Sequence, residues 1–141
     1  MDQIHWKPGW IERDPDEKSA MTHAIHIQDR WILEGGHSRT YPERVARADT
    51  FIWLDLPVGL RVARVLYRSA RYYGQTRPDL PDGCPEQLNR STIEFLAFIW
   101  RTRRTARAKL EAIASAARPD LTIIHLKTPR DVARWLATVK R

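Results

Sequence analysis

The chain has few of the features that mark secreted, membrane-spanning or disordered proteins. Cys84 is the one cysteine among 141 residues, so an internal disulfide is excluded. The first residues lack the charged and then apolar pattern of a secretory signal, and apolar runs such as 95–100 are far too short to cross a bilayer. With six glycines and 43% hydrophobic residues, disorder is not expected. We therefore expect one globular domain in the cytoplasm.

Acidic residues are scarce in the second part of the chain. Residues 1–60 carry a net charge of −3 and residues 61–141 carry +10, and 19 of the 24 basic residues are arginine. A planar guanidinium can hold two phosphate oxygens at once, whereas a lysine acts as a point charge. This bias indicates a phosphate-bearing partner. A solvated surface that keeps the protein soluble explains the charge equally well, so both interpretations stay open.

The pattern of apolar residues predicts strands that alternate with helices. Buried strands are expected at 31–34, 50–55 and 121–126. Helices are expected at 14–27, 40–48, 59–73, 91–117 and 128–139, the fourth opening on a capping box at Ser91–Glu94. The proline-rich and glycine-containing segment between the third and fourth helices predicts an irregular loop or lid. Because alternating strands and helices form right-handed crossovers, the expected class is α/β with a parallel sheet.

Two common kinds of site chemistry have no support in the residue spacing. The five histidines and Cys84 form no recognised ligand pattern, and His23 and His26 stand alone on their helix, so no metal site is predicted. The chain has no G-x-S-x-G turn, and a cysteine between glycine and proline is typical of a loop rather than of a nucleophile. Attention therefore turns to the carboxyl ends of the strands, around 34–40 and 55–57, where α/β proteins bind ligands.

Those strand ends resemble a known family. Residues 31–42, W-I-L-E-G-G-H-S-R-T-Y-P, resemble the adenylate kinase segment L-D-G-F-P-R-T-x-P with one residue inserted, and the strand, turn and helix from Leu54 resemble the family's approach to its lid. Further motifs resemble the FlaR-like "DNA topology modulation" branch of the P-loop kinases. They are W-K-P-G-W at 6–10, R-A-D-T at 47–50, L-D-L-P at 54–57, T-R-P-D at 76–79 and G-C-P-E at 83–86. Together these motifs span nearly the whole chain.

The resemblance implies a P-loop kinase-like fold of three layers, a parallel sheet with helices on both faces. A family member opens with a strand, a phosphate-binding G-x-x-x-x-G-K-[ST] loop and a helix. This chain has no Gly-Lys pair, and its resemblance begins near the second strand. We therefore expect residues 1–141 to form a single truncated domain that is missing the first strand, the P-loop and the first helix, with a lid-like loop at 74–90. The strands at 31–34 and 50–55 would then pair with each other, accept a foreign strand or leave exposed edges.

The resemblance also implies roles for individual residues. Arg64 and Arg68 match arginines that neutralise transferring phosphates, with a solvated helix face as the alternative. Arg39 matches the arginine that holds the acceptor's phosphate, and Glu34 matches a carboxylate that orients Mg²⁺ waters or acceptor groups; a surface ion pair and a backbone cap are their respective alternatives. Trp6 would stack a base or pack in the core. The arginines expected to bind phosphate from the lid are Arg77, Arg103 and Arg104.

The function that the resemblance implies is that of a P-loop nucleotide kinase or ATPase, with ATP and Mg²⁺ as cofactors. Its partner would be a nucleotide or a phosphorylated small molecule. Because the P-loop is absent, we expect this chain alone to bind Mg-ATP weakly and to turn over essentially nothing, so whether it is an enzyme stays open. The alternatives are a basic module that binds nucleic acid nonspecifically and a non-catalytic module that a partner completes. No membrane partner is expected, and neither the phosphate acceptor nor the oligomeric state follows from the sequence.

Overall fold

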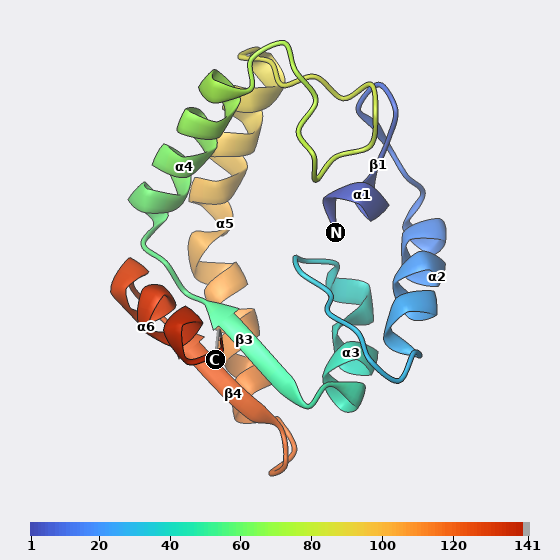
Figure 1. The fold of residues 1–141 in the computed structure, drawn as a ribbon, viewed down its shortest axis with the longest axis vertical. Helices are drawn as coiled ribbons and strands as arrows, with labels where there is room; N and C mark the ends of the chain where they lie inside the picture. The colour runs from blue at the N-terminus through green and yellow to red at the C-terminus, as the bar shows by residue number, and fades with distance from the viewer. Residues whose placement is uncertain (140–141) are drawn as a thin grey trace. The chain divides into compact units, whose positions relative to one another are not determined.

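A computed structural model of the chain describes residues 1–139 (Figure 1). The structure is mixed α and β, mostly helical, with a small parallel sheet. It forms two compact units: unit 1 comprises Met1–Ala48 and Ser69–Gln87, and unit 2 comprises Asp49–Arg68 and the chain from Leu88 onward. Within residues 1–139, none of the helices combines the length and apolar character that crossing a bilayer requires.

Unit 1 contains short helices and one antiparallel hairpin. Its elements are α1 (Asp2–His5), β1 (Trp6–Lys7), β2 (Ile11–Glu12), α2 (Pro15–His26), the 3-10 helix η1 (Ser38–Thr40) and α3 (Tyr41–Arg47). As predicted, α2 begins at an Asp14 cap, whose carboxylate accepts hydrogen bonds from the backbone N–H groups of Asp16 and Glu17 at 2.8 and 3.4 Å. Pro15 takes the first helical position, where no backbone donor is needed. The helix at 40–48 is also confirmed, whereas α1 and the hairpin were not predicted.

The predicted strand at 31–34 is wrong. The backbone N–H and C=O groups of a strand form hydrogen bonds with a neighbouring strand. In this structure the parallel sheet joins 50–54 to 122–126 and does not include 31–34. The backbone carbonyls of this segment instead accept hydrogen bonds from a side chain and from the N-terminal amine. Arg44 donates to the carbonyls of Leu33 and Gly35 at 2.9 and 3.2 Å, and the N-terminal amine donates to that of Glu34 at 3.0 Å. The segment is therefore an irregular link between α2 and η1.

Unit 2 is built on the two other predicted strands, which are confirmed. β3 (Thr50–Leu54) and β4 (Thr122–Leu126) pair in parallel, from Thr50 opposite Thr122 to Leu54 opposite Leu126. Two further backbone hydrogen bonds of 2.9 Å, Thr122 to Asp49 and Asp55 to Leu126, extend the ladder at both ends. The carboxyl ends of both strands therefore meet at one edge of the sheet.

The helices of the second part of the chain lie close to their predicted bounds. They are α4 (Val58–Arg71, whose last three residues belong to unit 1), α5 (Arg90–Ser115) and α6 (Pro129–Val139). The predicted capping box at Ser91–Glu94 is wrong. The Asn89 side chain accepts from the backbone N–H of Thr92 at 3.3 Å, and the Thr92 hydroxyl accepts from the backbone of Asn89 at 3.5 Å. The capping box therefore has the predicted spacing of three residues but begins at Asn89 instead of Ser91.

The interiors of the two units differ in chemistry. The buried side chains of unit 2 are apolar, among them Trp53, Ile99 and Leu126. In unit 1 the apolar Ile4, Leu80 and Cys84 share the interior with seven polar or charged residues. These are Lys18, Thr22, His26, Thr40, Ser69, Arg77 and Glu86. Because buried polar groups need hydrogen-bond or ion-pair partners, the interior of unit 1 depends on specific polar contacts more than the interior of unit 2 does.

Candidate functional site

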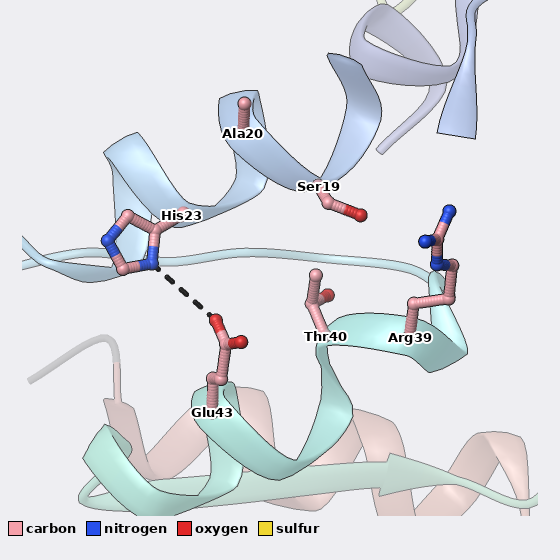
Figure 2. A pocket seen from close by; sticks show the side chains of 6 residues that line it. All are labelled: Ser19, Ala20, His23, Arg39, Thr40 and Glu43. Atoms are coloured by element: carbon pink, nitrogen blue, oxygen red, sulfur yellow. Dashed lines mark ion pairs between the residues drawn. The ribbon is translucent and has the colours of Figure 1, made fainter. Parts of the chain in front are cut away.

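A polar pocket lies in unit 1 between α2 and the η1–α3 segment (Figure 2). Its volume is about 400 Å³. Ser19, Ala20 and His23 line it from α2, and Arg39, Thr40 and Glu43 line it from the other side. Figure 2 shows Arg39 at one end of the pocket and the pair His23–Glu43 at the other. Hydroxyl, imidazole, carboxylate and guanidinium groups therefore border one small cavity.

Arg39 is the predicted phosphate-binding residue that this pocket contains. Its Nη2 lies 2.9 Å from Asp16 Oδ1, and its side chain is 58% exposed. An ion pair this exposed is worth less than about 1 kcal/mol, since water solvates both partners well. The guanidinium is therefore held loosely enough for an anion in the pocket to displace Asp16.

The wall of the pocket is fixed by hydrogen bonds around His37. His37 Nε2 lies 2.9 Å from Ser19 Oγ, which in turn donates to the carbonyl of Pro15 at 2.9 Å. The Thr40 hydroxyl donates to the His37 carbonyl at 3.0 Å. Burial lowers the pKa of His37 below 6.5, and nearby cations lower it further. The shift favours the neutral form of His37, whose ring joins α2 to η1.

The opposite end of the pocket brings together His23, His26 and Glu43. Glu43 Oε2 lies 3.5 Å from His23 Nδ1 and 3.4 Å from His26 Nε2. The His26 side chain is 1% exposed, and neither of its ring nitrogens has a hydrogen-bond partner within residues 1–139. The three ligand-type atoms lie within 4.8 Å of one another, so these residues could hold a metal ion. Sequence reasoning missed this group because Glu43 is far from the two histidines along the chain and no spacing motif connects them.

Glu34 and Trp6, the other predicted substrate-binding residues, also belong to unit 1. Glu34 is exposed, with Oε2 3.9 Å from the N-terminal amine, and it lines a second cavity of about 300 Å³. Trp6 is half-buried in β1 and packs edge to face against Trp10, with ring centroids 5.3 Å apart. The lining of the Arg39 pocket includes neither residue.

Arg77 is placed in the interior of unit 1, where carboxylates surround it. Its guanidinium is 4% exposed; Nε bonds Glu86 at 2.6 Å, Nη1 bonds Asp79, and Nη2 lies 3.4 Å from Asp2. Ser69 donates to the other oxygen of Glu86 at 2.9 Å. This network closes the lid-like loop on unit 1. Phosphate binding by Arg77 stays a prediction, and it would require these ion pairs to open.

The remaining predicted arginines lie on the helices of unit 2. Arg64 is exposed and Arg68 half-buried on α4, and Arg104 is exposed on α5. Arg103 is half-buried, with its guanidinium carbon 4.3 Å from the centre of the Trp100 ring. A cation over an aromatic face is held in place without losing its charge.

The carboxyl edge of the parallel strands carries a second polar cluster, within unit 2. Asp55 Oδ2 lies 3.2 Å from Arg107 Nη2 and 3.0 Å from His125 Nε2. The His125 ring stacks on Trp53, with centroids 3.9 Å apart and planes 2° from parallel. Sequence reasoning found the strand end at Asp55 but not the other two members, which lie 52 and 70 residues further along the chain.

Comparison of the chain with models of protein families, with curated proteins and with solved structures found no match.

Proposed function

We propose that this chain binds a nucleotide or phosphorylated small molecule as part of an adenylate kinase-like P-loop phosphotransferase. Arg39, on the pocket of unit 1, would hold the phosphate of the acceptor. The β3–β4 pair would belong to a three-layer parallel sheet with helices on both faces. The observation that carries the proposal is the loosely held Arg39 guanidinium at the edge of a polar pocket.

The size and charge of the pocket suit such a ligand. A volume of about 400 Å³ lies within the usual range for small-molecule sites. Exchange of the exposed Asp16 carboxylate for a phosphate would let the planar guanidinium donate to two phosphate oxygens at once, where it now has one contact with Asp16. Arg39 would thereby orient the acceptor, which is the main contribution that a protein makes to phosphoryl transfer.

The triphosphate of ATP has no comparable cradle in this chain. The glycine-rich loop that wraps phosphates with backbone N–H groups ends in a Gly-Lys pair, and no such pair occurs in the sequence. The residues present therefore do not fit Mg-ATP. Arg64 and Arg68 on α4, and Arg103 and Arg104 on α5, would supply further positive charge within unit 2.

Calorimetric titration of the full chain with adenosine monophosphate tests the proposal. Arg39→Ala should weaken binding at least about tenfold, because one charge-assisted contact of about 1.4 kcal/mol or more is lost. The matched control is Arg90→Ala, which removes the same charge from an ion pair with Glu94 on α5 whose arginine is 91% exposed. Equal affinities for the two variants, or no binding by the unchanged chain, would refute the assignment of Arg39.

A basic nucleic-acid-binding module is the second candidate, favoured by the net charge of +10 on residues 61–141. Such binding would rest on phosphate contacts and weaken steeply with salt. Fluorescence anisotropy with duplex and single-stranded DNA at low salt should then rise with protein concentration, and Arg39→Ala should leave the curve unchanged. A flat curve at low salt would remove this candidate.

A further inference from the structure

We propose that His23, His26 and Glu43 form a binding site for a divalent first-row transition metal, with Zn²⁺ as the ion that best suits them. Two imidazole nitrogens and one carboxylate oxygen are a ligand set that Zn²⁺ uses when it keeps a further position open. The pocket beside His23 and Glu43 provides space for a water or an anion at that position. The proposal does not depend on phosphate binding by Arg39.

The burial of His26 is the first argument. Its side chain is 1% exposed, yet neither ring nitrogen has a hydrogen-bond partner within residues 1–139. A buried polar group without a partner destabilises a fold, so a side chain of this kind needs an explanation. A metal ion that accepts the lone pair of Nε2 would provide one, because Nε2 faces Glu43.

The position of Glu43 is the second argument. One of its oxygens lies 3.4 Å from His26 Nε2 and 3.5 Å from His23 Nδ1, both longer than the usual hydrogen-bond range of about 2.7–3.2 Å. A tetrahedral ion with bonds of about 2.0–2.1 Å places its ligand atoms roughly 3.3 Å apart. The carboxylate therefore stands at the spacing that two ligands of one ion require.

The backbone around the cluster is already in place. His23 and His26 are three residues apart on α2, which puts them on one face of the helix. Arg47 of α3 donates to the carbonyls of His26 and Ile27 at 2.6 and 3.1 Å, so the end of α2 is tied to the helix that carries Glu43. The three ligand atoms lie within 4.8 Å of one another, and His23 and Glu43, each 58% exposed, can close this spacing by small side-chain rotations.

Calorimetric titration of the full chain with Zn²⁺ alone tests the site. We expect one ion per chain and a rise in the unfolding temperature. His23→Ala and Glu43→Gln should each weaken binding at least about tenfold, since a ligand contributes no less than the outer-sphere groups that cost about 10–100-fold when removed. His26→Ala should weaken binding by a similar factor. If loss of the buried His26 ring impairs folding, the variants at the exposed His23 and Glu43 still test the site.

The matched control is His5→Ala, which removes a histidine that also faces a carboxylate, Glu12 Oε1 at 3.6 Å, away from the cluster. It should leave the affinity for Zn²⁺ unchanged. Co²⁺ gives a second readout, because a tetrahedral cobalt site absorbs visible light and this band should vanish in His23→Ala. Absence of saturable binding, or an affinity that His23→Ala and Glu43→Gln leave unaltered, would overturn the proposal.

Discussion

Replacement of Arg77 by methionine should strongly destabilise unit 1. The substitution keeps the length and apolar stem of the side chain but removes the buried charge that faces Glu86, Asp79 and Asp2. Loss of one partner from a buried ion pair costs about 3–5 kcal/mol, because the remaining charge is left without compensation. Since whole domains are stable by only about 5–15 kcal/mol, this is a large fraction of the total.

Most of this loss should come through Glu86. Asp79 and Asp2 are partly exposed, so water replaces the guanidinium at roughly 1 kcal/mol or less for each. Glu86 is buried and would lose the charge of the guanidinium, while the hydrogen bond from Ser69 remains. Glu86→Gln in the Arg77→Met background removes the uncompensated negative charge of Glu86 and keeps a side-chain oxygen that accepts from Ser69. This double variant should recover about 2 kcal/mol.

Urea denaturation at pH 7, followed by tryptophan fluorescence, measures these differences. Trp10 is a suitable reporter, because its indole N–H donates to the carbonyl of Pro85 at 2.8 Å in the loop that Arg77 closes. Arg90→Met, at an exposed ion pair, is the control and should change stability by no more than about 0.5 kcal/mol. The reasoning is refuted if Arg77→Met costs no more than that control.

Two further predictions concern α2 and the wall of the pocket. Asp14→Ala should cost about 1 kcal/mol in the same urea assay, since the backbone donors of Asp16 and Glu17 lose their cap, and a neutral result would contradict it. Because burial lowers the pKa of His37 below 6.5, the unfolded chain binds more protons than the folded one between that lowered value and about pH 6.5. Stability should therefore fall as the pH drops through this window. His37→Gln should flatten the decline, measured by denaturation from about pH 7.5 to 5; an unchanged slope would count against it.

Several elements were predictable because their determinants lie within a few residues of one another. The Asp14–Pro15 start of α2 needs only a cap and a proline at adjacent positions. The strands at 50–54 and 122–126 follow from short apolar runs, and their parallel direction follows from the helical connection between them, whereas the pairing of these two strands with each other was not predicted. Arg39 was selected through a family resemblance at the end of a predicted strand; that strand is wrong, and the pocket that Arg39 lines lies between α2 and the η1–α3 segment.

The failures share one cause, which is that strand pairing and side-chain partners are long-range properties. The run at 31–34 has the composition of a strand, but its carbonyls bond to Arg44 and to the chain terminus. Likewise, nothing in the sequence around Arg77 indicates that it is buried, which only the approach of Asp2 and Glu86 brings about.

The sequence by itself determined the mixture of helices and strands, the five longer helices and two of the strands, through periodicity and capping that act over a few residues. Tertiary structure alone decided which charges meet. It brought Glu43 to the two histidines of α2 and brought Arg107 and His125 to Asp55, across separations of 17 to 70 residues. The physical reason is that the energy of a charged or polar side chain depends on what is packed around it after folding, and spacing along the chain does not specify that environment.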